Sequence, residues 1–146
     1  MRQGPTELST GAGAALARRL AGALILLLAA AASAAAAGDA VRGKRTFQRC
    51  YSCHSVDPAE TAKLQGPSLY RIMGRPAAKV PGFEYSDAMR KKGAAGLVWD
   101  AATLDRYIAD PEDVVPGTSM GAPPLRDEQE RADLIAYLAL SGPYKP

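Results

Sequence analysis

Cysteine and histidine occur together at one place in this chain of 146 residues. Cys50 and Cys53 are its two cysteines, and His54, its single histidine, follows directly. Each thiol can add across one vinyl group of a haem, and the adjacent imidazole can then reach the iron from one face. The run Cys50-Tyr51-Ser52-Cys53-His54 therefore has the spacing of a c-type haem attachment signal.

Two other uses of these thiols fit the sequence less well. A redox disulfide of the C-x-x-C type expects strands alternating with helices around it, and no such pattern of strands is found. A structural zinc site needs four Cys or His ligands, and the whole chain has three such residues. Covalent haem is thus the interpretation that the motif favours, and the rest of the chain supplies the context.

The first part of the chain has the layout of an export signal. Arg18 and Arg19 precede an uncharged run over residues 20–38, which ends in alanines that offer several small-x-small cleavage sites. We expect cleavage after Ala37, which makes residues 1–37 a secretory signal peptide and residues 38–146 one periplasmic domain. The alternative is an uncleaved leader that anchors the protein to the inner membrane, because 19 uncharged residues are just long enough to span a bilayer.

Cysteine usage and charge agree with export. In an oxidising compartment two exposed thiols would pair with each other unless a cofactor uses them. The net charge of +3 falls to +1 once residues 1–37 are set aside, because the leader holds three arginines and one glutamate. This balance is not that of a nucleic-acid-binding protein. We expect no nucleic-acid partner and, after cleavage, no association with the membrane.

The hydrophobic pattern predicts an all-α fold with three main helices, one or two short ones and long loops. Asp39 can cap a first helix that runs through the haem motif. The apolar face of this helix would hold Val41, Phe47 and Cys50. Gly43 lies inside it at a cost of about 1 kcal/mol relative to alanine, so we expect another helix to approach closely there.

Two main helices lie in the second half of the chain. The helix capped by Asp100 should stop at Asp110–Pro111, because proline disfavours helix at the residue before it. The last helix begins with a capping box, Asp127-x-x-Glu130, and ends before Gly142–Pro143. Between these two helices, residues 114–124 contain three prolines and two glycines and should form irregular backbone.

Two short helical segments are expected between the first and second main helices. Leu69–Met73 could form one helical turn, and a short helix capped by Ser86 or Asp87 should extend to Lys92. The remaining loops are long for a helical domain with so few apolar stripes. A large flat apolar cofactor in the centre would supply the missing core.

The iron needs a second side-chain ligand of another type, because His54 is the only histidine. Methionine thioether is the usual choice in electron-transfer haem sites, and the candidates after the leader are Met73, Met89 and Met120. Met73 and Met89 lie in short helical patterns, where methionine more often fills a core. Met120 instead ends the irregular run Pro116-Gly117-Thr118-Ser119-Met120, which can present a side chain inward.

This run resembles the segment that carries the axial methionine in class I c-type cytochromes, specifically the mitochondrial-type and bacterial cytochrome c2 branch. The likeness covers residues 38–140 and includes Pro111, nine residues before the methionine. It implies the small cytochrome c fold wrapped around one haem c. The haem would be bound covalently through the two cysteines of the motif, with its iron ligated by His54 and Met120.

Further positions resemble residues of the haem pocket in this family. Pro67 resembles the proline whose carbonyl accepts a hydrogen bond from the proximal imidazole, a contact that orients His54. Arg75, Tyr85 and Trp99 resemble the residues that hydrogen-bond the haem propionates. The arginine would neutralise a carboxylate in a low dielectric.

Other matches concern the methionine side and the chain ends. Tyr107 resembles the tyrosine near the methionine sulfur, and Thr118 resembles another haem-pocket hydroxyl. Gly43 on the first helix and Tyr137 on the last match the crossing of the terminal helices in the family. This match supplies a packing reason for the glycine.

The chain also departs from the family pattern. Ala122 stands where the family has an aromatic residue, which would leave that end of the haem crevice more open. Met89 replaces an asparagine and so removes a polar group from the pocket. Lysines of the family's docking ring are replaced by Glu112, Asp113 and Ser119. The charge of the partner therefore cannot be carried over from the family.

The resemblance implies a one-electron carrier between respiratory or photosynthetic complexes, and not an enzyme. Its electron donor would be a bc1-type complex or another donor, and its acceptor a terminal oxidase, a reaction centre or a periplasmic enzyme. We expect a monomer. Two alternatives stay open. One is a haem enzyme or gas sensor with an open iron position, against which the lack of a second histidine counts. The other is a dedicated electron-accepting subunit of a periplasmic dehydrogenase.

Overall fold

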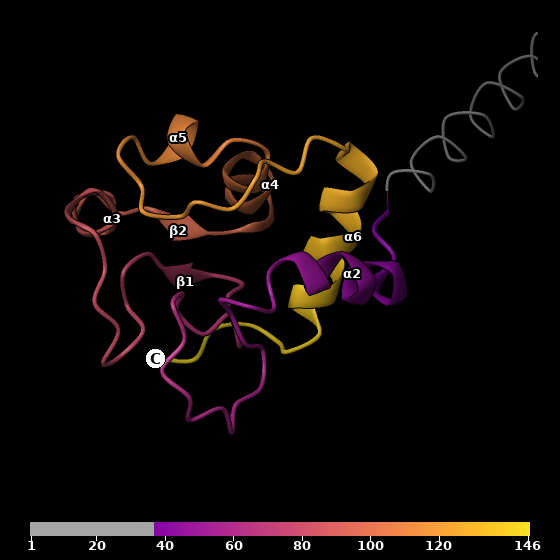
Figure 1. Ribbon diagram of the computed structural model, residues 1–146, viewed down its shortest axis with the longest axis horizontal. Helices are drawn as coiled ribbons and strands as arrows, with labels where there is room; N and C mark the ends of the chain where they lie inside the picture. The colour runs from indigo at the N-terminus through magenta and orange to yellow at the C-terminus, as the bar shows by residue number, and fades with distance from the viewer. Residues whose placement is uncertain (1–36) are drawn as a thin grey trace, which may run out of the picture. The chain divides into compact units, whose positions relative to one another are not determined.

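The structure, a computed structural model, describes residues 37–146. The predicted signal peptide, residues 1–37, lies outside this part except for its last residue. Five α-helices, one 3-10 helix and one pair of short strands follow one another in the described chain (Figure 1): α2 (Ala40–Thr46), η1 (Phe47–Arg49), β1 (Arg75–Pro76), α3 (Asp87–Ala94), β2 (Val98–Trp99), α4 (Ala101–Ala109), α5 (Pro111–Val114) and α6 (Glu128–Ala139). The predicted all-α class is confirmed.

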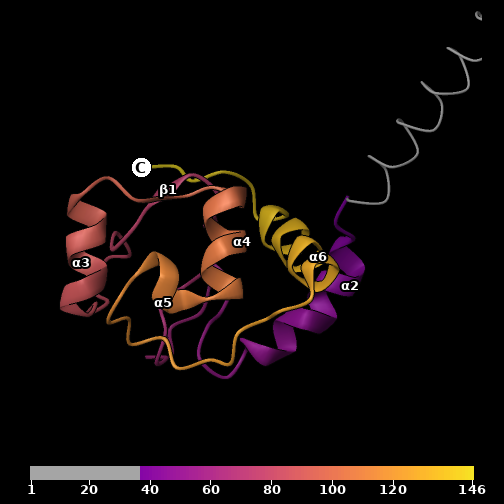
Figure 2. The same cartoon turned by 90° about the horizontal axis from the view of Figure 1, so that it is seen from above.

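The first and last helices cross and pack on each other (Figures 1 and 2). A Cβ atom built on Gly43 would lie 1.9 Å from the carbonyl oxygen of Asp133 in α6, so only glycine fits at the crossing. The close helix approach expected at this glycine is confirmed. The rings of Phe47 and Tyr137 pack beside it, with their centroids 5.4 Å apart.

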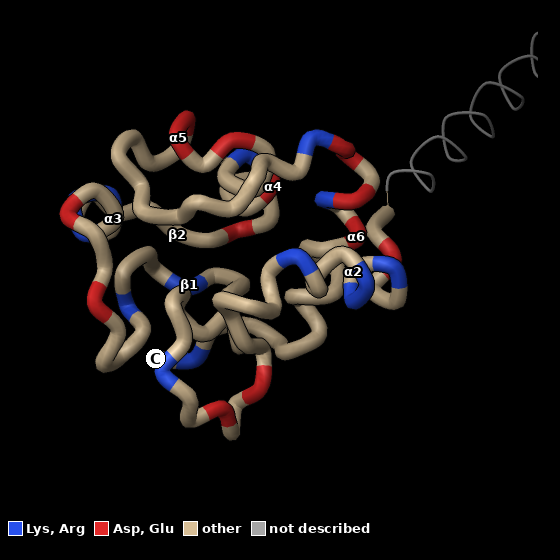
Figure 3. Tube along the Cα trace, viewed as in Figure 1, with Lys and Arg blue, Asp and Glu red and all other residues tan. Residues whose placement is uncertain are grey.

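Charged residues are distributed unevenly over the helices (Figure 3). α2 carries Lys44 and Arg45 in its last turn, whereas α5 carries Glu112 and Asp113 in its first turn. Other helices carry both signs: α3, for example, has Asp87 in its first turn and Lys91 and Lys92 in its last.

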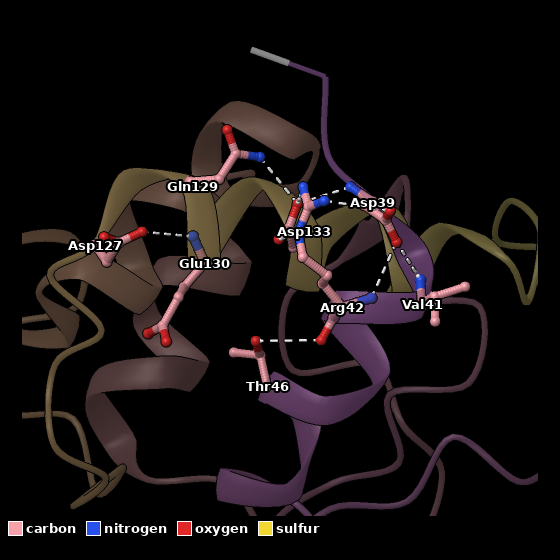
Figure 4. A network of polar contacts seen from close by, with 8 residues as sticks. All are labelled: Asp39, Val41, Arg42, Thr46, Asp127, Gln129, Glu130 and Asp133. Atoms are coloured by element: carbon pink, nitrogen blue, oxygen red, sulfur yellow. Dashed lines mark hydrogen bonds and ion pairs between the residues drawn. The ribbon is translucent and has the colours of Figure 1, made fainter. Parts of the chain in front are cut away.

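A buried carboxylate joins the two crossing helices (Figure 4). Asp133 is only 3% exposed and accepts four hydrogen bonds. Arg42 donates from Nε to Oδ2 at 2.6 Å and from Nη2 to Oδ1 at 2.9 Å. The Asp39 backbone N–H donates at 2.7 Å and the Gln129 amide at 2.9 Å. These hydrogen bonds, that of Arg42 foremost, hold the pKa of Asp133 well below its usual range.

The expectation that the first helix runs through the haem motif is wrong. α2 ends at Thr46, and the chain tightens into η1 and then into turns closed by hydrogen bonds such as Cys53 N–H to Cys50 O, 3.0 Å. Cysteine, tyrosine and serine are weaker helix formers than alanine, and 3-10 turns are common where α-helices end. Val41 is also 68% exposed, because six residues turn a helix by about one and two-thirds turns and so separate it from Phe47.

The three other predicted helices are present as α3, α4 and α6. Each begins at an expected N-cap residue, whose side-chain oxygen accepts a backbone N–H at the start of the helix. These residues are Ser86 (3.3 Å), Asp100 (2.7 Å) and Asp127 (2.7 Å). The N-cap residues in the sequence therefore predicted where these helices begin.

Two segments differ from the expectation. α4 stops before Pro111 as predicted, but the chain at once begins α5, which is capped by the Asp110 carboxylate and has proline at its first position. Proline is favoured there because its φ is already helical and its missing N–H is not needed. Leu69–Met73 forms a turn and not a helix, and Arg71 within it has a φ of +52°.

The strands β1 and β2 pair antiparallel over two residues each, with Arg75 opposite Trp99. The sequence did not predict this ladder. It brings together two expected site residues that are 24 positions apart in the chain. Within residues 37–146, no helix combines the length and apolar character needed to cross a membrane.

Candidate functional site

A cavity of about 590 Å³ lies between the loops and the inner faces of the helices. Every site residue expected from the sequence lines it: Cys50, Cys53, His54, Pro67, Arg75, Tyr85, Trp99, Tyr107, Thr118 and Met120. The structure therefore brings all ten to one place, although they are spread over 71 residues of the chain.

His54 is held at one wall of the cavity by a single hydrogen bond. Its Nδ1 lies 2.7 Å from the Pro67 carbonyl oxygen. Because a carbonyl can only accept, Nδ1 carries the hydrogen, and the lone pair of Nε2 is left free for a metal. Burial lowers the pKa of His54 despite this hydrogen bond, which favours the neutral, metal-binding form.

Gly66 fixes the position of the same imidazole. A Cβ atom on this glycine would lie 2.3 Å from Cε1 of His54, so any side chain would displace the ring. The backbone N–H of Gly66 also donates to the Cys53 carbonyl at 2.8 Å, which ties this turn to the motif. Sequence reasoning assigns a role here only to Pro67, whose carbonyl accepts the hydrogen bond of His54. A glycine directly before that proline was the available signal for the close approach.

The two thiols lie at the cavity beside His54. Both cysteines are free and half-buried. Burial raises the pKa of Cys50, so its thiol is protonated at neutral pH. Cys53 Sγ lies 3.7 Å from the side-chain oxygen of Gln65.

Met120 reaches the cavity from an irregular segment that is anchored to α4. The Thr118 hydroxyl accepts the Met120 backbone N–H at 3.2 Å and lies 2.8 Å from the Tyr107 hydroxyl. Tyr107 is buried and packs against the Trp99 ring at a centroid distance of 4.9 Å. Of the other methionines considered, Met89 also lines the cavity, whereas Met73 is not among the lining residues of the described chain.

Arg75 is a buried cation at the cavity wall, only 7% exposed. Its guanidinium donates to the carbonyls of Ser68 (2.7 Å) and Tyr70 (3.2 Å). Burial lowers its pKa, and within residues 37–146 no carboxylate lies at ion-pair distance from it. An arginine in this setting suits an anionic group in the cavity, because such a group would compensate the buried charge.

The apolar part of the wall was predicted only in part. Leu134 and Leu138 come from the expected stripe of α6 and line the cavity. Ile72 and Leu125 also line it and are almost fully buried, but they lie in loops. Periodicity gives no signal for such positions, so sequence reasoning missed them. Ala122 is exposed and lines the cavity, which leaves this end open.

Comparison with known proteins identifies the family to which this chain, and therefore its cavity, belongs. The family model for cytochrome c matches residues 40–141. The chain belongs to the cytochrome c family. A cytochrome c2 of Rhodomicrobium vannielii is 47% identical to this cytochrome over 103 residues, which cover 70% of the chain and 79% of the relative.

Two solved structures are similar to the fold of this cytochrome. Cytochrome c2 from Rhodospirillum centenum aligns with a TM-score of 0.66 and 34% identity, over 73% of this chain and all of that protein. Cytochrome cH from Methylobacterium extorquens aligns with a TM-score of 0.62 and 38% identity, over 70% of this chain and 99% of that protein. The predicted small cytochrome c fold is therefore confirmed.

These similarities establish this cytochrome as a class I c-type cytochrome of the c2 branch, an electron carrier and not an enzyme. A c-type cytochrome binds haem c covalently through cysteines. The cavity fits that group: two free thiols stand beside an imidazole with a free nitrogen, apolar side chains line the walls, and a buried guanidinium has no acidic partner within residues 37–146. The roles of individual residues remain predictions.

Proposed function

We propose that this cytochrome is a periplasmic one-electron carrier whose haem iron is held between His54 and Met120. The main support is that both side chains line one cavity, with Nε2 of His54 left free by the bond from Nδ1 to Pro67. Bound there, haem supplies reversible one-electron chemistry at its iron. With His54 and Met120 both holding the iron, the carrier would need no substrate site.

The chain's own residues attach, orient and tune the cofactor. Cys50 and Cys53 hold it covalently, and Pro67 fixes the ring orientation and tautomer of His54. The bond from Met120 N–H to the Thr118 hydroxyl holds the thioether segment in place. A thioether ligand in an apolar cavity favours the reduced state, so we expect a positive reduction potential.

Arg75, Tyr85 and Trp99 form the side of the cavity that suits the haem propionates. The guanidinium of Arg75 is buried and bonded only to carbonyls. The Tyr85 hydroxyl accepts the Val80 backbone N–H at 3.2 Å, so its own hydrogen is free to donate. These donors would stabilise carboxylates that are removed from water.

Export and partners belong to the same proposal. Residues 1–37 would act as a secretory signal and residues 38–146 as the mature domain. A Cβ atom on Gly38 would lie 2.0 Å from the carbonyl oxygen of Ala132, so the residue after the proposed cut packs against α6. Intact mass of the exported protein reports leader removal and haem attachment together. Retention of residues 1–37 would contradict the cut.

A bc1-type complex would donate the electron, and a terminal oxidase, reaction centre or periplasmic enzyme would accept it. Basic Lys44 and Arg45 on α2 and acidic Glu112 and Asp113 on α5 give the surface a mixed character. We expect a freely diffusing monomer. A stable complex with one dehydrogenase on a sizing column would favour a dedicated subunit instead.

Met120→Ala tests the proposed iron ligation. The oxidised wild-type protein should show the weak far-red absorption band of Fe(III)–thioether bonding, and the variant should lose the band and bind CO or cyanide readily. Met89→Leu is the matched control, because Met89 also lines the cavity, and it should keep the band. A band that survives in Met120→Ala, or disappears in Met89→Leu, would contradict the assignment.

A further inference from the structure

The segment that follows α6 returns across the molecule. Gly142 has a φ of +79°, which turns the chain out of the helix. Both views show the C-terminal trace running beside the segment that leads into β1 (Figures 1 and 2). The family model matches residues 40–141, so residues 142–146 lie beyond that match.

Three hydrogen bonds attach this C-terminal segment, residues 141–146, to the turn over residues 68–75. The Tyr144 backbone N–H donates to the Met73 carbonyl at 2.8 Å. Arg71 donates its backbone N–H to the Ser141 hydroxyl at 2.8 Å and its Nε to the Ser141 carbonyl at 3.3 Å. The Ser141 hydroxyl itself donates to the Leu138 carbonyl at 2.9 Å, which connects the turn to α6.

The turn needs such support because its backbone is strained. Arg71 has a φ of +52°, in the left-handed region that residues other than glycine rarely adopt. Two of the three hydrogen bonds from the segment go to this residue. Its guanidinium also lies over the Tyr70 ring, 5.2 Å from the centroid.

The same turn determines where Arg75 lies. The two carbonyls that accept from its guanidinium belong to Ser68 and Tyr70, which directly precede Arg71 in the same turn. Burial lowers the pKa of Arg75, and the phenols of Tyr85 and Tyr144 oppose this effect.

We propose that Ser141 and Tyr144 are positioning residues for Arg75, which they hold against the cavity by fixing the turn over residues 68–75. The inference rests on the proposed carrier function, with haem in this cavity. A cation fixed at the wall stabilises the reduced site, which carries one positive charge less than the oxidised site. The C-terminal segment therefore raises the reduction potential through Arg75.

Midpoint potentials in a double-mutant cycle test this inference on the holo-protein. Ser141→Ala, and separately removal of Pro143–Pro146, should lower the potential. Removal of Lys145 and Pro146 alone is the control, because both are exposed and Tyr144 stays in place. Combined with Arg75→Gln, the first two changes should cause no further fall. The inference would be overturned if the potential fell equally with Arg75 and with Arg75→Gln, or if it did not fall when Arg75 is present.

If Arg75→Gln does not fold, the same test can be made with a second variant of Arg75. Arg75→Lys keeps the charge but lacks the fork that reaches both carbonyls, so the effect of Ser141→Ala should again disappear. An effect as large as in the wild type would contradict the inference.

Amide hydrogen exchange gives a readout that does not depend on the iron ligands. In Ser141→Ala the Arg71 amide should exchange at least about tenfold faster, because it loses its acceptor. Unchanged exchange would contradict the role of Ser141. The far-red band separately reports the fate of the proposed His54/Met120 ligation, so the two proposals can fail independently.

Discussion

The crossing of α2 and α6 and the wall of the cavity differ in what fills them. At the crossing, Gly43 lies against the backbone of α6, and Asp133 is satisfied by four donors of the protein itself. At the wall, Gly66 lies against the ring of His54, and buried side chains face a space of about 590 Å³. The comparison shows that one region is completed by the chain, whereas the other is completed by the cofactor.

Loss of covalent haem should produce the largest effect, because the cavity would lose the cofactor that completes it. Cys50→Ala/Cys53→Ala leaves Ile72, Leu104 and their neighbours around an unfilled cavity. We expect most of the helix signal in far-UV circular dichroism to disappear. Tyr51→Ala is the control within the same motif, because Tyr51 is 67% exposed, and it should retain the signal. A well-folded double variant without haem would show that the cofactor does not act as core.

Gly43→Ala should have the next largest effect and should be confined to stability. The new methyl group would meet the carbonyl of Asp133, which cannot move without shifting α6. Overpacking of this kind costs about 3 kcal/mol in the free energy of unfolding, measured by denaturant titration. Lys44→Ala, at an exposed neighbouring position, should change it by less than about 0.5 kcal/mol. A tolerated Gly43→Ala would contradict the close contact between the helices.

Gly66→Ala should disturb the site more than the stability. Its methyl group would meet a side chain, which can move, so we expect a smaller loss of about 1–2 kcal/mol. Displacement of His54 should break its hydrogen bond to Pro67 and change the visible spectrum and the reduction potential. Gly43→Ala is the matched comparison and should leave the spectrum unchanged. An unchanged spectrum in Gly66→Ala would show that the glycine does not fix His54.

Asp133→Asn should have the smallest effect on the comparison, and its signature is a weaker dependence of stability on pH. The hydrogen bond from Arg42 lowers the pKa of Asp133 below its value in the unfolded chain, near 3.9. The stabilisation is therefore fully present above about pH 5 and is lost as the pH falls through the lowered value. Unfolding free energy should fall less steeply below about pH 4 in the variant than in the wild type. Glu128→Gln, an exposed carboxylate on the same helix, should keep the wild-type slope.

Local chemistry made the crossing of the terminal helices largely predictable. N-cap side chains such as Asp39 and Asp127 act within three residues of their own position, so the sequence contains the whole signal. Gly43 was identifiable because a glycine inside a helix needs a reason. The early end of α2 was missed, because weak propensities over four residues do not mark where an α-helix becomes a 3-10 turn.

The sequence predicted many residues of the cavity wall, but not the backbone geometry that brings them together. The motif and the resemblance to the family identified ten site residues, and all ten line the cavity, together with others such as Ile72 and Leu125 that were missed. The positive φ of Arg71 and the ladder between Arg75 and Trp99 could not be foreseen, because both depend on contacts between distant segments. Likewise, nothing local to Ser141 indicates that its hydroxyl accepts from Arg71.

The pairing of α2 with α6 has a consequence for synthesis of the protein. Contacts such as Asp39 N–H to Asp133 Oδ1 join residues 94 positions apart. The domain therefore cannot close until the whole chain through α6 is available, and any shorter N-terminal length leaves the glycine face of α2 uncovered. Until then, the crossing of the two helices cannot restrict access to the cysteines of the motif.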